Sequence, residues 1–252
     1  MRGTVRTSTT ALMALTAVLL APALASAHIT ISSGPAYVAQ YAQEVVFQIP
    51  HGCAGNDTSS ITVEIPTEIT SVRASPSTFG SVAFDGDKFP VGDPKAGQLQ
   101  RVKTVTWTKP DANRFATDTG YYKLSLYVQI PNAPYTKLYF KTHQVCKDGN
   151  GATLATDWIG TSGTPSTTED AGPAPEPAPS VLILPAKKAG WNKVTVPVAI
   201  TDLATWFADV AIVWKGTSAF SVNPATVEQI KATAGTTLLT ALAAGDEIWV
   251  KY

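Results

Sequence analysis

Apolar and polar residues alternate along much of the chain, with a period of two rather than 3.6. Short runs rich in Val, Ile, Tyr, Phe and Thr show this pattern, with Pro, Gly, Asn and Asp at their ends. They span residues 41–50, 60–66, 102–108, 121–131 and 137–145. Each run predicts a strand with one buried face, because successive side chains of a strand point to opposite faces. The set predicts a mainly β fold, an antiparallel β-sandwich.

Two stretches depart from this alternation. Residues 75–100 contain many Gly, Pro and Asp residues and predict a hairpin or an extended surface loop. The composition then changes near residue 161 to a run rich in Pro, Thr and Ala without apolar periodicity. Such a run is typical of an extended, semi-rigid spacer, and we place a Pro-rich linker at residues 163–180.

The remaining residues, 181–252, predict a small α+β module. We expect its strands at residues 181–184, 193–200, 211–214 and 246–252. Asn223 as the N-cap and Pro224 at the first helical position predict a helix that runs to residue 234, and residues 237–244 predict a second short helix. A module of this size is near the lower limit for folding alone, so we expect it to lean on the first domain. It contains no motif of recognised chemistry.

The first 27 residues have the composition of a secretory signal peptide. Arg2 and Arg6 precede an apolar run at residues 11–20, and Ala25-Ser26-Ala27 supplies the small residues of a cleavage site. The apolar run is too short to anchor the chain in a bilayer. We therefore expect cleavage after Ala27, export to the periplasm or the extracellular space, and no membrane anchor.

Cleavage changes the composition in ways that bear on function. The whole chain balances 19 Lys and Arg against 19 Asp and Glu, and loss of the two arginines leaves it slightly acidic. Neither nucleic acid nor an anionic membrane is expected as a partner. Both methionines, Met1 and Met13, leave with the leader. The two cysteines, Cys53 and Cys146, predict a disulfide in an exported chain, with two buried thiols as the alternative.

The candidate chemistry lies in three histidines: His28, His51 and His143. After cleavage His28 is the first residue, and its α-amino group and imidazole Nδ1 can close a six-membered chelate ring on one metal ion. A pair of nitrogens in one plane suits Cu(II), which prefers tetragonal N,O coordination. The alternative is that His28 only begins a strand with its ring in solvent. His51 and His143 taken alone are more typical of ordinary surface or core residues than of metal ligands.

An ordered set of motifs brings in a family resemblance. It consists of HITI at residue 28, PHGCAG at 50–55 followed by Thr58, ITVEIP at 61–66, VTW at 105–107, QVC at 144–146 and DWIG at 157–160. Over residues 28–162 the chain resembles the YcnI-like copper-binding domain. The resemblance implies an exported sandwich of Ig or cupredoxin-like kind that binds Cu(II) through the amine and ring of His28, a one-histidine brace. It also implies a role in envelope copper homeostasis or trafficking, with a Cu(I) chaperone or copper transporter as partner.

The same resemblance assigns roles to other residues. Trp158 matches the tryptophan beside the metal, although a tryptophan between strands is otherwise a usual core residue. The cysteine pair of the family falls on Cys53 and Cys146. Family members complete the site with a carboxylate, for which Glu64, Glu44 and Glu68 are the candidates here.

Two other kinds of metal site remain open. An oxidase of the lytic polysaccharide monooxygenase kind would need a second histidine beside His28, either His51 or His143. A structural Zn site could use His51, Cys53, His143 and Cys146 if the thiols were reduced. Tight Cu(I) binding is not expected, since the mature chain offers neither thioether nor thiolate. No hydrolase, nucleotide-binding or paired-carboxylate motif is present. We therefore expect a metal-binding protein without catalytic residues, not an enzyme.

Overall fold

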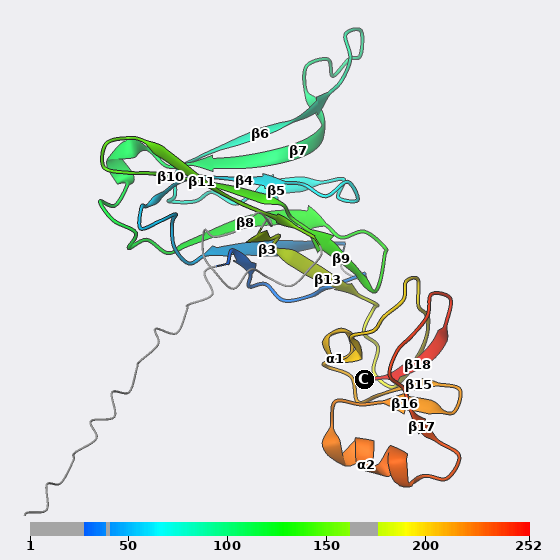
Figure 1. The fold of residues 1–252 in the computed structure, drawn as a ribbon. Coiled ribbons are helices and arrows are strands. Elements are labelled where there is room, and N and C mark those ends of the chain that lie inside the picture. The colour runs from blue at the N-terminus through cyan, green and yellow to red at the C-terminus, as the bar shows by residue number, and fades with distance from the viewer. Residues whose placement is uncertain (1–27, 39–40, 162–175) are drawn as a thin grey trace, which may run out of the picture.

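The computed structural model describes residues 28–38, 41–161 and 176–252 (Figure 1). The expected signal peptide at residues 1–27 and residues 162–175 of the expected linker lie outside the described residues. The described chain forms a β-sandwich followed by a smaller α+β module (Figure 1). None of the helices among these residues is long and apolar enough to cross a bilayer.

The sandwich is built from a four-stranded and a six-stranded sheet. All strand pairs are antiparallel except the one between β11 and β12. The first sheet has the order β1 (Thr30–Ile31), β3 (Ala42–Ile49), β8 (Tyr122–Gln129), β5 (Val72–Ala74). The second has the order β12 (Glu176–Pro177), β11 (Thr153–Gly160), β10 (Thr142–Lys147), β4 (Thr58–Glu64), β7 (Leu99–Thr108), β6 (Ser81–Lys88). The expected mainly β sandwich is confirmed.

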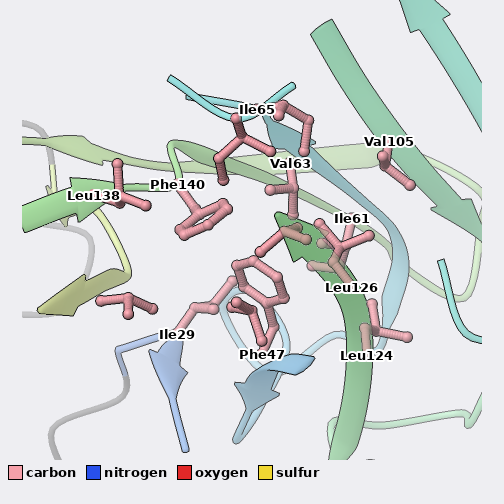
Figure 2. Close-up of a cluster of buried hydrophobic side chains, with 14 of the residues drawn as sticks. Ile29, Phe47, Ile61, Val63, Ile65, Val105, Leu124, Leu126, Leu138 and Phe140 are labelled. Atoms are coloured by element: carbon pink, nitrogen blue, oxygen red, sulfur yellow. The ribbon is translucent and has the colours of Figure 1, made fainter. Parts of the chain in front are cut away.

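The hydrophobic core lies between these two sheets. Alternate residues of β3 and β4 point inward, and Phe47, Ile61 and Val63 are completely buried (Figure 2). The ring of Phe47 meets that of Phe140 edge to face, with centroids 5.5 Å apart. Full burial of one such side chain stabilises the fold by about 1.5–3 kcal/mol. The period-two pattern therefore marks the residues that hold the sheets together.

Part of the chain forms a third, three-stranded sheet beside the sandwich. It has the order β2 (Ala36–Tyr37), β13 (Ser180–Leu184), β9 (Thr136–Tyr139). The single strand expected at residues 137–145 is therefore wrong, because the chain passes from β9 into β10 of a different sheet. Phe140 and Thr142 are both buried, and the Thr142 hydroxyl donates to the Phe140 carbonyl at 2.9 Å. The alternation continues through this change of sheet, so periodicity could not reveal it.

The expected hairpin in residues 75–100 is present as β6 and the start of β7. A single turn of 3-10 helix, Asp111–Asn113, follows β7.

The expected end of the linker at residue 180 is wrong. Glu176 pairs with Trp158 in β11, and β13 pairs antiparallel with β9. Val181 and Ile183 are buried in the sandwich core, which explains why this segment returns to the first domain. The sandwich thus includes residues up to Leu184, and the module begins after it.

The C-terminal module contains one five-stranded sheet and two helices. The Asn223 side chain accepts from the Ala225 amide at 2.9 Å and caps α2, as the sequence predicts. The second helix expected at residues 237–244 is wrong: the segment forms a short strand and then an isolated bridge through Leu242. The sheet order is β14 (Trp191–Thr195), β18 (Glu247–Lys251), β15 (Ile212–Lys215), β16 (Ser218–Phe220), β17 (Thr237–Leu238), and the helices are α1 (Leu203–Trp206) and α2 (Pro224–Ala232).

The module rests against the sandwich. Tyr135, in the loop before β9, is buried in the core of the module, with its ring 5.4 Å from that of Phe207. The hydroxyl of Tyr37 donates to Asp209 at 3.2 Å. These contacts agree with the expectation that so small a module leans on the first domain.

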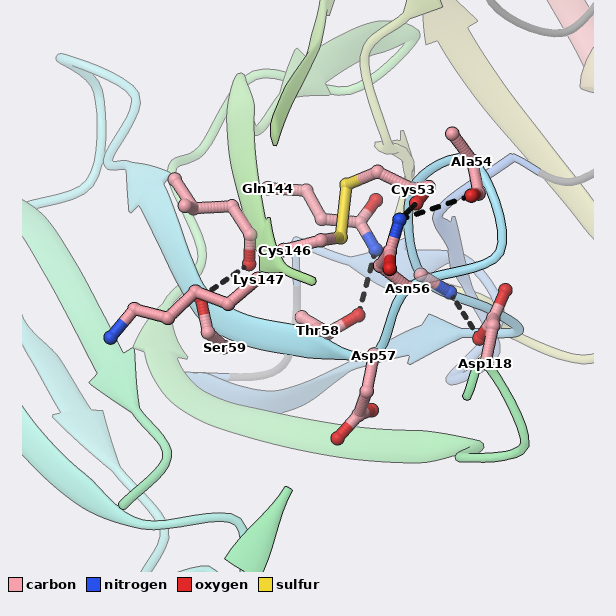
Figure 3. Close-up of a disulfide and its surroundings, with 12 residues drawn as sticks. Cys53, Ala54, Asn56, Asp57, Thr58, Ser59, Asp118, Gln144, Cys146 and Lys147 are labelled. Atoms are coloured by element: carbon pink, nitrogen blue, oxygen red, sulfur yellow. Dashed lines mark hydrogen bonds between the residues drawn. A yellow bond between two sulfur atoms is a disulfide. The ribbon is translucent and has the colours of Figure 1, made fainter. Parts of the chain in front are cut away.

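A disulfide joins Cys53 and Cys146, as expected (Figure 3). It links the turn after β3 to β10, with Cα atoms 5.7 Å apart and a sequence separation of 93 residues. The bond therefore closes a long loop that contains β4 to β9.

Replacing both cysteines with alanine should lower the free energy of unfolding. The chain-entropy model gives an upper value of about 4–5 kcal/mol for a loop of this length. Urea unfolding of the wild type and the double variant measures the loss, and reduced wild type is the matched control. Equal unfolding free energies for oxidised and reduced protein would contradict the prediction.

Candidate metal centre

The position of His28 is set by its neighbour in the sequence. Ile29 is only 2% exposed and belongs to the sandwich core, and β1 pairs directly after it with β3. The buried isoleucine and the pairing of Thr30 with Gln48 hold the chain at the end of the sandwich. His28 therefore lies at the rim of the core with its side chain largely buried, and its ring contacts Trp158 of the second sheet.

Trp158 is the aromatic neighbour of His28. The two ring centroids are 5.5 Å apart at an interplanar angle of 74°, an edge-to-face contact. The indole is buried, and its N–H donates to the side-chain carbonyl of Gln144 at 3.1 Å. The structure thus brings together the histidine and the tryptophan that the sequence analysis named.

Gln144 connects this pair to the turn after β3. Its amide nitrogen donates to the His51 carbonyl at 2.8 Å. The same nitrogen donates to the Thr58 hydroxyl at 2.9 Å (Figure 3). Because Gln144 itself is buried, its amide can satisfy its hydrogen bonds only in this orientation. The tryptophan beside His28 is therefore held by a defined polar network, not by apolar packing alone.

Glu176 is the carboxylate beside His28. Its Oε2 lies 3.1 Å from Nε2 of the His28 ring, and both side chains are largely buried. The parallel pairing of Glu176 with Trp158 fixes this position. The sequence analysis missed Glu176, because it lies in a Pro-rich run without periodicity. The signal that could have indicated it is that no other charged residue occurs between residues 171 and 186.

The contact with Glu176 determines which ring nitrogen of His28 can bind a metal. An ionised carboxylate only accepts, so Nε2 carries the proton of this hydrogen bond. The lone pair of the neutral ring is then on Nδ1, the nitrogen nearer the main chain. Histidines that bind metals are commonly held in this way by a carboxylate on the other ring nitrogen.

The three glutamates named from the sequence lie elsewhere. Glu64 follows the buried Val63 on β4 and points to the outer face of the six-stranded sheet, where it meets His143. Glu44 is exposed on β3, across from Tyr127. Glu68 is exposed in a turn and accepts from the adjacent Thr67 hydroxyl at 3.1 Å. The structure therefore offers Glu176 in their place as the carboxylate near His28.

His143 is held between two carboxylates on the outer face of the sheet. Its Nδ1 lies 2.7 Å from Asp157 and its Nε2 lies 2.9 Å from Glu64. Burial lowers the pKa of His143, but the hydrogen bonds with Glu64 and Asp157 and their charges raise it overall. Adjacent residues of a strand point to opposite faces, so His143 faces away from the Gln144–Trp158 side where His28 lies. It does not complete a copper site with His28.

His51 lies in the turn that follows β3, the strand paired with the His28 segment. Its Nδ1 is 2.5 Å from the Gly52 carbonyl and 3.7 Å from Asp118. Gln144, which donates to the His51 carbonyl, also accepts from Trp158, the aromatic neighbour of His28, so the turn with His51 lies near the candidate centre.

The structural Zn site from His51, Cys53, His143 and Cys146 is ruled out by the disulfide. Both sulfur atoms are bonded to each other, so neither is available as a thiolate. Within the described ranges, no group of three or more His, Cys, Asp and Glu residues is arranged to hold a metal ion. A brace on His28 would differ from such groups, because two of its donors come from one residue.

A match to a known protein family covers nearly the same residues as the sandwich. A family model described as "Domain of unknown function (DUF1775)" matches residues 28–183. The chain belongs to the DUF1775 family. The matched region begins at His28 and ends within β13, so it includes both Trp158 and Glu176.

Solved structures give more distant likenesses to this DUF1775 protein. An uncharacterized protein from Nocardia farcinica, described as having an immunoglobulin-like fold, is 19% identical with a TM-score of 0.45, over 63% of this chain and 99% of that chain. The major pilin subunit BcpA of Bacillus cereus is 12% identical with a TM-score of 0.31, over 88% of this chain and 54% of that chain. A search of curated proteins finds no match.

The contacts of His143 with Glu64 and Asp157 should make the free energy of unfolding depend on pH. Because its pKa in the folded state is raised above the ordinary value of about 6.5, the protonated ring stabilises the fold below that pH. This contribution is lost as the pH rises through the folded-state pKa. Unfolding free energies of wild type and His143→Gln should therefore differ more at about pH 5.5 than at about pH 8.5. An equal difference at both pH values would contradict this account of His143.

Proposed function

We propose that this DUF1775 protein is an exported Cu(II)-binding protein whose metal ligand is its own amino-terminal residue, His28. The observation that carries the proposal is the setting of the His28 ring. Glu176 holds Nε2 and Trp158 packs against the ring, so that Nδ1 keeps its lone pair on the main-chain side. Removal of residues 1–27 would place a primary amine next to that nitrogen.

The donors fit Cu(II) better than other common metals. The α-amine and Nδ1 of one residue form a chelate with two nitrogens in one plane, which matches the tetragonal preference of Cu(II). An ordinary α-amino group has a pKa of about 8, so its deprotonation by a bound cation near neutral pH is a small step. The disulfide and the expected loss of both methionines leave no soft sulfur donor for Cu(I).

Glu176 and Trp158 would tune this site through their contacts with the His28 ring. The negative charge of Glu176 makes the imidazole more basic and attracts a cation, and both effects are larger where side chains are shielded from water. The buried indole of Trp158 excludes water from one flank. The resemblance of the HITI, PHGCAG and DWIG motifs to the YcnI-like copper-binding domain supports the same interpretation.

The most consistent role is copper homeostasis or trafficking in the cell envelope. A site that binds Cu(II) and lacks soft ligands would release the ion on reduction, so a Cu(I) chaperone or transporter is the partner that the chemistry implies. Binding is favoured over oxidase activity, because His143 faces the other side of its sheet and Nδ1 of His51 is held at the Gly52 carbonyl.

The proposal predicts that Cu(II) binding needs a free α-amine at His28. The processed chain should bind one equivalent of Cu(II), and a chain with one extra residue before His28 should lose that binding. The extension keeps the imidazole but turns the amine into an amide. Calorimetric titration of both forms is the measurement. Equal binding by the two forms would contradict the proposal and direct attention to His51 and His143.

Loss of the Glu176 carboxylate should weaken the same site. Glu176→Ala removes the acceptor that orients the ring, and such changes commonly reduce metal affinity by about 10–100-fold. Glu68→Ala is the matched control, because Glu68 is an exposed glutamate that hydrogen-bonds only within its own turn. Competition titration with a copper chelator measures both affinities. The account fails if the two variants bind with the affinity of the wild type.

A further inference from the structure

A lysine and an aspartate are buried together at the ends of two adjacent strands of the six-stranded sheet, β4 and β7. Asp57 directly precedes β4 and Lys109 directly follows β7, and the Lys109 amide donates to the Ser59 carbonyl at 2.8 Å. The side chains are 3% and 0% exposed for Lys109 and Asp57, and Nζ lies 2.7 Å from Oδ2. Figure 3 shows the Asp57 side chain pointing away from the disulfide. The proposed copper site does not use this pair.

Aromatic rings surround the lysine ammonium group. Nζ lies 3.9 Å from the ring centroid of Tyr122, 5.0 Å from that of Phe79 and 5.6 Å from that of Phe115. The rings of Phe79 and Tyr122 also pack edge to face, with centroids 5.0 Å apart. These rings exclude water from the pair, so the amine and the carboxylate meet in an environment of low polarity.

Each oxygen of Asp57 has its own hydrogen-bond donor. Tyr122 donates its hydroxyl to Oδ1 at 2.5 Å, and the main-chain amide of Phe115 donates to Oδ2 at 2.8 Å. Lys109 Nζ in turn donates to the Tyr122 hydroxyl oxygen at 2.5 Å. Tyr122 therefore bridges the amine and the carboxylate and can pass a proton from one to the other.

Burial shifts the pKa values of Lys109 and Tyr122 in opposite directions. Desolvation lowers the pKa of Lys109, against the hydrogen bond and the charge of Asp57, which raise it. Burial, followed by the hydrogen bond to Asp57, raises the pKa of Tyr122, so the phenol keeps its proton. The lowered pKa makes the Lys109 ammonium easier to deprotonate, and the raised pKa keeps the proton on the Tyr122 oxygen. A buried ion pair is in any case a weak source of stability, because its desolvation offsets the attraction.

We propose that Lys109 and Asp57 form an intramolecular amide bond, an isopeptide cross-link between the end of β7 and the start of β4. The Nζ–Oδ2 contact places the amine beside the carboxyl carbon, and Tyr122 and Phe115 stand where acyl transfer needs a proton relay and an oxyanion donor.

The reaction is a condensation that releases one water molecule and needs no other reactant. The Lys109 ammonium first gives a proton to the Tyr122 oxygen while Tyr122 gives its own proton to Asp57 Oδ1. The lone pair of Nζ then forms a bond to the carboxyl carbon, and Oδ2 bears the developing charge against the Phe115 amide. A proton from nitrogen joins the hydroxyl at Oδ1, the C–O bond breaks, and water leaves. The product is a neutral secondary amide with Oδ2 as its carbonyl oxygen.

The fold favours this condensation, although free amines and carboxylic acids do not condense in water. Reacting groups held at contact distance gain effective molarities of about 10⁵–10⁸ M. Conversion of the pair to an amide also removes two buried charges, and the aromatic rings keep water from the new bond. The link would close a loop of 52 residues.

Accurate mass measurement of the intact, processed protein is the test. The proposal predicts a mass lower by one water molecule than that of the disulfide-bonded sequence, together with a fragment in which peptides containing Asp57 and Lys109 are joined. A mass equal to that of the disulfide-bonded sequence would overturn it, because the pair would then be an ion pair only.

Three variants identify the bond. Asp57→Asn should reach the same final mass as the wild type, because an asparagine forms the same amide with loss of ammonia. Lys109→Arg keeps the positive charge and should retain its full mass. Tyr122→Phe removes the proton relay, and its fraction of linked protein should rise more slowly after refolding. A deficit of one water that persists in Lys109→Arg would assign the loss to another site and overturn the proposal.

Discussion

The burial of Ile29 in the sandwich core is the interaction on which the candidate metal centre depends. A residue next to the expected cleavage site is ordinarily free to move, but here its neighbour is fixed between the sheets and β1 pairs with β3. Residue 28 therefore has a defined place at the rim of the core. Its ring meets Trp158 and Glu176 because residue 28 is held beside the core by its neighbour Ile29.

Glu176, the carboxylate beside His28, lies near the C-terminal end of the same domain. After the Pro-rich segment the chain returns to the sandwich, where β12 adds to the edge of the six-stranded sheet and β13 joins β9. The edge pairing places Glu176 beside Trp158, and so beside His28. The beginning and the end of the domain thus form one site, and the DUF1775 match over residues 28–183 includes both.

The alternation of apolar residues predicted the sandwich, because an inward-facing residue in every second position is what a buried sheet face requires. It could not predict the break between β9 and β10, where a buried Phe140 and a buried Thr142 keep the same period across two sheets. At Thr237–Leu238 the sequence predicted a helix, but the segment forms a strand because it pairs with β16. Intrinsic propensity is weaker than such tertiary contacts.

The candidate site was predictable only in part. His28 follows from the cleavage motif, and Cys53 and Cys146 from their number and the expected compartment. Glu176 does not, because its role comes from strand pairing across a Pro-rich segment. The buried pair of Lys109 and Asp57 was equally invisible, since charged residues are rarely buried and nothing in the sequence marks these two as exceptions.

The most direct test of the metal centre is the crystal structure of the processed protein with Cu(II), with anomalous diffraction data collected at the copper edge. We expect one strong anomalous peak, bonded to the α-amine and Nδ1 of His28, with Nε2 still hydrogen-bonded to Glu176 and the ring still against Trp158. A peak at His143 or His51 without contact to the His28 amine would contradict the account.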